Sequence, residues 1–477
     1  MIYIILILAF ILRVIKLNQS LWLDEAININ AIRGLGFKDI VFNYSLGDFH
    51  PPLYHVLLKS WMLIFPVSEI SIRMMSVILG VATIFITYKI AKALFEKKTA
   101  LISAALLSTA PLHIYYSQEA RMYMLASFFA SLSVYFFVLI IKKDNLYLWV
   151  GFITSTVLML YSDYLPYLLI PAYMIYLLLL KKTINKSTLA SFVPGFLLIF
   201  GLIIPWLMIF PKQFATGISV AAISPAWAQV VGSPSIKTLV VTFVKFAIGR
   251  ISVENNLIYG LLFAPIAIFI SSMFVVSIFR MSKARLFLWL WLVGPIILGF
   301  IIAFFVPIFA YFRFIFVLPA FYIIVASAIN SVNIQKLTKT LFVFALTINL
   351  ASLSIYFIYP KFQRENWKAA TDYVLNNSSQ NSIVLFESAY SMAPFDYYNQ
   401  EKIETAGALN AFNAERKNVE ENVSKLTTGK DQVFLFQYLS GITDPSGILF
   451  EKISETGFKN ISTVDFAGVG FVYEFRH

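Results

Sequence analysis

Long apolar segments separated by short polar ones dominate the first 360 residues. A run of about 20 apolar residues can cross a lipid bilayer as a helix. The pattern predicts about eleven membrane-spanning helices, with ends placed to within about three residues. These runs lie near residues 1–17, 70–91, 99–117, 121–141, 146–162, 165–180, 188–210, 257–279, 286–306, 314–330 and 340–359.

The loop after the first span, residues 18–69, contains two shorter helical patterns. Residues 24–33 predict one short helix. Residues 51–65 are mostly apolar, but His55 and Lys59 interrupt the run one helical turn apart. That segment is too short to span, so it predicts a helix lying in the membrane interface, with proline in its first turn.

The pattern changes after residue 360. Residues 361–477 carry 15 acids and 11 bases, and their apolar runs are short. NWKAATDYVLNN has helical spacing, whereas SIVLFES, QVFLFQYL and GVGFVYEF have the character of buried strands. We therefore expect an α-helical polytopic membrane domain over 1–360, which includes the outer loop and its juxtamembrane helices, and a small soluble α/β domain over 361–477.

The composition supports a membrane protein. The chain is 59% hydrophobic with a mean hydropathy of +0.77, which is too apolar for a soluble globular protein. The absence of cysteine excludes disulfides and thiolate metal sites. The first apolar run lacks a basic start and a cleavage site, so it predicts a retained helix. The net charge of +12 comes from short loops between spans, which argues against nucleic acid as a partner.

Lysine and arginine gather in alternate loops, and this predicts the orientation. Lys97, Lys142, Lys182, Lys283 and Lys336 mark five such loops. By the positive-inside rule these loops and the N-terminus are cytoplasmic, so the C-terminal domain is extracytoplasmic and the protein crosses the cell membrane many times.

Carboxylates are scarce in the first 360 residues, yet four of the ten lie between Arg13 and Tyr54. Asp24 and Glu25 are the first pair. A carboxylate near the outer surface can act as a general base, with its neighbour as a helper. An aspartate at this position can equally cap the helix that follows. Both roles can hold at once.

Glu119 and Arg121 occupy a short turn between two spans, on the same predicted side as Asp24. The turn is either functional or simply solvated. His50 either contacts a metal or phosphate or caps the helix that begins after it. One histidine with scattered carboxylates supplies few ligands for a metal.

Arg313 lies at the predicted outer end of a span. It can clamp a lipid-linked phosphate with the two-pronged geometry of guanidinium, or it can anchor a lipid headgroup. Arg13 and Lys16 break the positive-inside pattern and indicate an anionic partner outside. Tyr116 is either a sugar-stacking ring or a member of an interfacial aromatic belt.

Five motifs carry a resemblance to a known family. They are SLWLDEA, DFHPPLYHVLLKSW, SQEARMY, YFRFIFVLPA and RENWKAATDYV, in this order. Together they resemble the GT-C glycosyltransferases of the dolichyl-phosphate-mannose protein mannosyltransferase and aminoarabinose transferase superfamily. The resemblance implies a catalytic Asp24 with Glu25 beside it, an acidic Glu119 in the second outer turn, and a donor-phosphate contact from Arg313.

The resemblance also implies the reaction. Such enzymes transfer a sugar from a polyprenyl-phosphate donor, with inversion, to a lipid, glycan or protein acceptor. The remaining substrate-binding candidates are Arg13, Lys16, His50, Arg121, Tyr116 and Asp163; Asp163 stands where relatives often have Thr-His-Tyr. A divalent cation is left open, with Glu119 and His50 as candidate ligands. We expect the C-terminal domain to shape access for the acceptor.

A secondary transporter or flippase is the alternative function. Transporters place ionisable residues near the membrane midplane. In this sequence the charges avoid the middle of the spans and the acids collect toward one face, which favours the enzyme.

Overall fold

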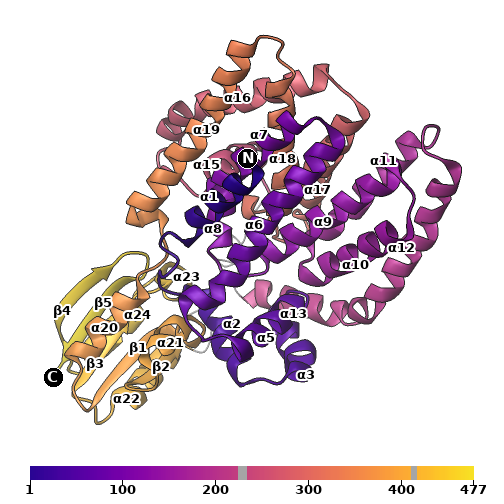
Figure 1. Ribbon diagram of the computed structural model, residues 1–477. Coiled ribbons are helices and arrows are strands. Elements are labelled where there is room, and N and C mark those ends of the chain that lie inside the picture. Colours follow the sequence, from indigo (N-terminus) through magenta and orange to yellow (C-terminus); the bar gives the residue numbers. More distant parts are fainter. Residues whose placement is uncertain (224–231, 233, 410–415) are drawn as a thin grey trace. The chain divides into compact units, whose positions relative to one another are not determined.

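The computed structural model describes residues 1–223, 232, 234–409 and 416–477. They form two compact units (Figure 1). The helical unit comprises residues 1–17, 37–216 and the described part of 229–358. The α/β unit comprises residues 18–36, 217–223 and the described part of 359–477. The beginning of the first long loop therefore folds with the C-terminal domain, although the sequence placed it with the spans.

Seven helices of the helical unit are long and apolar enough to cross a membrane, within the described chain. Each matches a predicted span. They are α6 (Glu69–Leu94), α9 (Tyr123–Lys142), α12 (Lys186–Leu207), α16 (Asn256–Phe279), α17 (Lys283–Ile302), η3 (Tyr311–Val317) continued by α18 (Leu318–Asn330), and α19 (Gln335–Ile358).

The other predicted spans are shorter or interrupted. The segment predicted as one span over 99–117 breaks at Ala110, because Pro111 starts a new helix there. The count of eleven spans stays a prediction. The remaining helices of this unit are α1 (Ile2–Val14), α3 (Phe37–Asp39), η1 (Ile40–Tyr44), α4 (Ser45–Gly47), α5 (Leu53–Ile64), α7 (Lys97–Thr109), α8 (Pro111–Ser117), α10 (Leu146–Ser162), η2 (Leu165–Leu168), α11 (Leu169–Leu180), α13 (Phe210–Ile223, which ends in the α/β unit) and α15 (Ile236–Ile248).

The outer surfaces of these helices are apolar. Leu197 on α12 is 66% exposed, and Ile268 on α16 is 68% exposed. Buried hydroxyls join neighbouring helices inside the unit: Ser133 lies 2.7 Å from the Thr156 hydroxyl and 2.8 Å from that of Tyr173. Apolar surfaces that face outward and polar contacts between helices are what a bilayer selects, so this unit is a membrane-embedded bundle.

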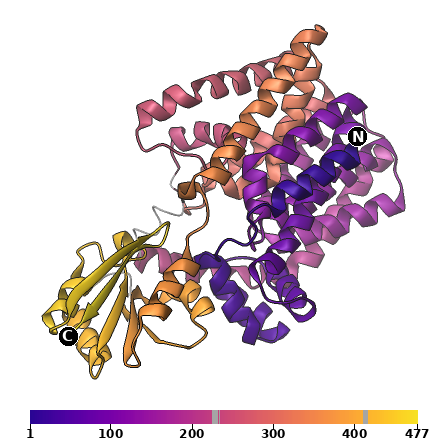
Figure 2. The same ribbon diagram turned by 60° about the vertical axis from the view of Figure 1, so that its left-hand side comes forward.

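The α/β unit contains a five-stranded sheet in the order β2-β1-β3-β5-β4 (Figure 2). The strands β1, β2 and β3 are parallel, whereas β5 runs antiparallel to β3 and β4. The elements are α2 (Leu23–Gly34), η4 (Pro360–Phe362), α20 (Trp367–Asn377), β1 (Ser382–Ser388), η5 (Ala389–Ser391), α21 (Ala393–Asn399), β2 (Glu404–Leu409), α22 (Arg416–Thr427), β3 (Gln432–Phe436), α23 (Ser440–Thr443), α24 (Ile448–Glu455), β4 (Lys459–Phe466) and β5 (Gly470–Arg476).

Alternate residues of the central strands face two separate cores. Val384 and Phe386 of β1 pack with Trp367 of α20 and with α21, whereas Ile383 and Leu385 pack with α22 and α24. This period of two is the expected consequence of strand geometry. The tail thus contains the small α/β domain that its sequence predicts; the three-layer α/β/α arrangement is a finding of the structure, and Leu23 of α2 belongs to the Trp367 core.

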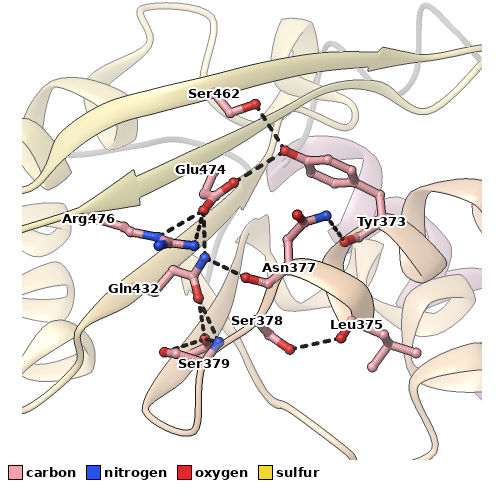
Figure 3. Close-up of polar contacts among 10 residues, drawn as sticks. Tyr373, Leu375, Asn377, Ser378, Ser379, Gln432, Ser462, Glu474 and Arg476 are labelled. Atoms are coloured by element: carbon pink, nitrogen blue, oxygen red, sulfur yellow. Dashed lines mark hydrogen bonds and ion pairs between the residues drawn. The ribbon is translucent and has the colours of Figure 1, made fainter.

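A buried polar network closes the end of the sheet where β1 and β3 begin (Figure 3). The Gln432 amide donates to Glu474 at 2.7 Å, and the Gln432 carbonyl oxygen accepts from Ser382 at 2.7 Å. The Tyr373 hydroxyl lies 3.0 Å from Ser462 and 3.3 Å from Glu474. This network joins the C-terminal half of α20, where Tyr373 lies, to β4 and β5.

Candidate active site

Asp48 lies at the centre of a polar cluster in the loop before α5. Its Oδ2 atom is 3.0 Å from Nε2 of His55, and its Oδ1 atom is 3.8 Å from the guanidinium of Arg121. Burial by itself would raise the pKa of the Asp48 carboxyl, but the hydrogen bond from His55 and the charge of Arg121 hold it well below its usual range. Asp48 therefore stays ionised and orders both partners.

The local sequence brings these groups together. Pro52 precedes α5, so that His55 falls in the first turn of the helix. Phe49 has a φ of 60°, a left-handed conformation that costs a non-glycine residue about 1 kcal/mol or more. The Gln213 amide holds the loop by donating to the carbonyl oxygens of Ser45, at 2.6 Å, and His50, at 3.2 Å. Backbone strain of this kind is typical of functional loops.

His50 belongs to the same cluster. Its Nε2 atom lies 3.5 Å from Arg121, and because arginine only donates, Nε2 is the accepting nitrogen and Nδ1 carries the proton. Burial lowers the pKa of His50 to about 3, so the imidazole is neutral at physiological pH. Its Nδ1 atom is buried and has no hydrogen-bond partner among the described residues. An uncharged N–H donor is thus available to a ligand.

Arg313 in η3 lies within electrostatic range of both His50 and Asp163. Its guanidinium has no acceptor in the part of the chain that the structure describes. Asp163 follows α10 and accepts a hydrogen bond from the Tyr164 amide at 2.7 Å. Burial raises the pKa of Asp163 to about 6, against the opposing charges of Arg313 and Arg121. His50, Arg121, Asp163 and Arg313 therefore share one neighbourhood.

The turn that carries Glu119 and Arg121 is not solvated. Glu119 is 1% exposed and Ala120 is 0% exposed. The Gln118 amide donates to the carbonyl oxygens of Arg13, at 2.9 Å, and Ile15, at 2.7 Å, so the turn is tied to the end of α1. A buried acid and a buried base in a turn need partners, and Arg121 finds them in Asp48 and His50. The alternative of a simple solvated turn is wrong.

Arg250 is a site candidate that the sequence interpretation missed. It follows α15, and its guanidinium lies 4.6 Å from the ring centroid of Tyr115 and donates to the Tyr115 hydroxyl. The Glu119 carboxylate and Arg250 both lie within electrostatic range of Tyr116 and Tyr311. Asp48 and His55 were likewise not chosen as site residues, although the spacing DFHPPLYH places both beside His50. No comparable signal surrounds Arg250 in the sequence.

Asp24 and Glu25 lie in α2 and belong to the α/β unit. The helix begins at Leu23, so Asp24 lies in the first turn and is not the N-cap expected as an alternative. Glu25 is 0% exposed, and its Oε2 atom accepts from the Trp22 amide at 3.3 Å. The buried Glu25 carboxylate therefore caps the helix, whereas Asp24 is only partly buried and remains reachable.

Two other predicted candidates, Arg13 and Lys16, have structural partners. Arg13 is 0% exposed and donates to Ser117 and to the carbonyl oxygens of Ala9 and Ser108. Its NH2 atom also lies 2.8 Å from His113. Such a guanidinium joins α1 to α7 and α8 and is enclosed by protein. The Lys16 ammonium donates to the Phe357 carbonyl oxygen at 2.6 Å.

Tyr116 is also enclosed. It is 3% exposed, its ring stacks on Phe312 with centroids 5.5 Å apart, and Tyr123 meets it edge-on at 4.8 Å. Phe312 covers one face of the ring, and the low exposure of Tyr116 leaves little of its surface open for stacking on a sugar.

A protein-made metal site is not found. Within residues 1–223, 234–409 and 416–477 no three His, Asp or Glu side chains come together as ligands. Glu119 and His50, the two candidate ligands, are therefore not part of a group of three such side chains in this part of the chain.

Comparisons with known proteins agree with this architecture. Residues 49–209 match the family of dolichyl-phosphate-mannose-protein mannosyltransferases. An uncharacterized protein of Aquifex aeolicus (strain VF5) is 26% identical over 185 residues, which are 38% of this chain and 36% of that protein. The matched segment thus spans about a third of that relative.

Solved structures resemble the whole chain. ArnT from Cupriavidus metallidurans bound to undecaprenyl phosphate is similar over 99% of this chain and 96% of its own, with 10% identity and a TM-score of 0.60. The archaeal oligosaccharyltransferase AglB from Archaeoglobus fulgidus, in complex with an inhibitory peptide and a dolichol-phosphate, is similar over 99% of this chain and 74% of its own, with 12% identity and a TM-score of 0.55. The chain has the GT-C fold seen in these structures, and its residues 49–209 are similar to the dolichyl-phosphate-mannose-protein mannosyltransferase family.

Proposed function

We propose that this protein is a membrane glycosyltransferase that moves a sugar from a polyprenyl-phosphate donor to an acceptor hydroxyl on the outer face of the membrane. The observation that carries the proposal is the neighbourhood of His50, Arg121 and Arg313. It offers one guanidinium without an acceptor and one neutral imidazole N–H without a partner among the described residues. Those are donors suited to phosphate oxygens.

The charge of the site supports an anionic ligand. Asp48 is ionised but is occupied by His55 and Arg121. Asp163, with a pKa of about 6, carries a charge at pH 7 that offsets only part of the positive charge. Arg313 is thereby left for a phosphate that arrives from the lipid phase. Donors fixed in a low-dielectric site stabilise charge far better than donors in water.

We assign the proton transfer to Asp24. The acceptor oxygen attacks the anomeric carbon while the bond from that carbon to the phosphate oxygen breaks. The leaving phosphate takes the bonding electron pair, and Asp24 takes the hydroxyl proton. A single displacement of this kind inverts the anomeric carbon and requires no covalent sugar–enzyme adduct. Glu25 supports Asp24 by capping its helix.

ArnT and AglB give the proposal its class of donor. The structures that resemble this chain contain undecaprenyl phosphate and dolichol-phosphate respectively.

The test is a transfer assay with purified protein in detergent. An undecaprenyl-phosphate sugar is supplied without any ion gradient, and undecaprenyl phosphate and the glycosylated product are measured by mass spectrometry with a membrane-extract acceptor. The proposal expects release of the lipid phosphate in step with product. A donor that stays intact with every acceptor fraction would overturn it.

A further inference from the structure

The short helix α2 carries Asp24, and it is bound to the C-terminal domain. Leu23 of α2 lies in one hydrophobic core with Trp367, and both are buried. Ala26 and Ile29 of α2 are also 0% exposed. Helix α2 therefore belongs to the α/β unit although some 330 residues separate it from that domain in the sequence.

Hydrogen bonds fix the chain that leads into α2. The Arg364 amide donates to the Gln19 side chain at 2.8 Å, and the Lys368 amide donates to the Ser20 hydroxyl at 3.1 Å. The Leu21 amide donates to the Tyr398 hydroxyl at 2.8 Å. Because Lys368 lies in the first turn of α20, its amide has no partner within that helix, and Ser20 supplies one.

A second group of contacts holds the far part of α2. The Asn30 amide donates to the Ala393 carbonyl oxygen at 2.9 Å, and the Arg33 guanidinium lies 5.9 Å from the ring centroid of Tyr397. Both partners are in α21. Contacts at each end of α2 restrict its rotation as well as its translation, which a single contact does not do.

The segment of residues 364–368, which binds the chain before α2, is itself held in place. Glu365 accepts from the Trp367 indole at 2.7 Å and from the Tyr438 hydroxyl at 2.9 Å. A side chain on Gly468 would come within 3.0 Å of the Glu365 backbone, so glycine permits this close approach. The residues RENWK thus form a fixed platform whose two ends bind Gln19 and Ser20.

We propose that the C-terminal domain positions the catalytic helix, and that Ser20, Tyr398 and the RENWK platform are positioning residues for Asp24. The inference rests on the function proposed above. It gives this domain a task in the chemical step, in place of the expected role in acceptor access alone. Small displacements of a catalytic group lower the rate steeply, because the reacting atoms must be aligned.

Two matched double variants of the full-length protein test the inference. Ser20→Ala/Tyr398→Phe removes two hydrogen bonds to the loop. Ser462→Ala/Tyr373→Phe removes the same two kinds of hydroxyl from the network at the other end of the sheet (Figure 3). Both changes therefore cost the domain hydroxyl contacts, and only the first touches the approach to α2.

Amide hydrogen exchange of residues 21–34 is the first readout, and kcat against donor KM is the second. We expect Ser20→Ala/Tyr398→Phe to speed amide exchange in α2 by about 10- to 30-fold, because two hydrogen bonds are lost. We expect its kcat to fall about tenfold with donor KM unchanged, whereas the control variant keeps wild-type values for α2 exchange and kcat.

The outcomes separate the two proposals. Equal α2 exchange in both variants would show that the loop contacts do not hold the helix. Faster α2 exchange with wild-type kcat would show that docking does not position Asp24. If the wild-type protein transfers no sugar, the proposed function fails, and the exchange measurement still decides whether the domain holds α2.

Discussion

Nε2 of His55 lies 3.0 Å from Oδ2 of Asp48. This contact ties the first turn of α5 to the loop that presents His50, and Asp48 also faces Arg121. The Asp48 carboxylate therefore interacts with two specific side chains, His55 and Arg121. It orders one imidazole and one guanidinium, while His50 and Arg313 keep donors for a ligand.

Arg313 is expected to bind the donor phosphate. Arg313→Lys replaces a planar fork by a point charge and should weaken donor binding about tenfold or more, since charged hydrogen bonds are worth about 1.5–3 kcal/mol each. Binding of a radiolabelled undecaprenyl-phosphate sugar measures the effect. Arg280→Lys, in a loop away from the cluster, is the matched control and should bind as the wild type does. Equal affinity in the two variants would contradict the assignment.

Asp163 predicts a pH dependence of donor binding. Its pKa is raised to about 6, so the side chain gains a negative charge as the pH rises through that value. That charge lies near Arg313 and Arg121 and opposes an anionic ligand, while neutral His50 does not titrate in this range. The dissociation constant should therefore rise by about threefold to tenfold between pH 5 and 7.

Asp163→Asn is the control for this pH effect. The variant cannot gain the charge, and the donor is a phosphodiester that stays ionised throughout, so its affinity should be flat over the same range. A pH dependence that survives in Asp163→Asn would assign the titration to another group.

The predicted topology can be read with single cysteines, because the chain contains none. Gln400→Cys in the C-terminal domain should react with a membrane-impermeant maleimide on intact cells, whereas Lys142→Cys should react only after lysis. Both positions are exposed in the structure. The reverse pattern of labelling would invert the orientation.

Glu387 makes the stability of the C-terminal domain depend on pH. Burial raises the pKa of Glu387 to about 8, although the Thr443 hydroxyl donates to it at 2.5 Å. The folded state holds this proton more tightly than the unfolded state, so the stabilisation is complete below about pH 4.5 and is lost as the pH rises through 8.

Glu387→Gln keeps an oxygen that can accept from Thr443 and removes the titration. The variant should lose fewer degrees of Tm than the wild type between pH 5 and 8, by an amount on the order of several degrees. Thermal unfolding of the full-length protein at the two pH values measures the difference. Parallel curves for the two proteins would mean that Glu387 does not titrate in this range.

The elements that could be predicted from the sequence are those surrounded by apolar groups on all sides. Spans that face lipid and neighbours read as long apolar runs, and Ser382–Ser388 was predicted to the residue because the strand is buried on both faces. The missed strands, β2 and β4, are the two edges of the sheet. Edge strands carry polar and small residues, as Lys459–Phe466 does, so their pattern resembles a loop.

The candidate site was only partly visible in the sequence. His50, Arg121 and Arg313 are ionisable groups near a predicted membrane boundary, where such groups need solvent, a partner or a function, and Asp163 is indicated by the family resemblance. Asp48 and His55 were not chosen, because their ion pair depends on how the loop folds. The attachment of α2 to a domain far away in the chain had no local signal at all, and RENWKAATDYV gained a role only when Ser20 was found beside Lys368.

Sugar transfer by Asp24→Asn measures the central claim most directly. Asparagine keeps the size of the side chain in the first turn of α2 and removes the proton acceptor. General-base catalysis contributes about 10²–10⁴-fold, so kcat should fall by that factor while donor affinity and Tm stay at wild-type values. Glu25→Gln, whose side chain can still accept from the Trp22 amide, should lose less. Sugar transfer by Asp24→Asn at a rate near that of the wild type would contradict the assignment of Asp24 as the general base. If Glu119→Gln were inactive in the same assay, the general base would be Glu119 in the second outer turn.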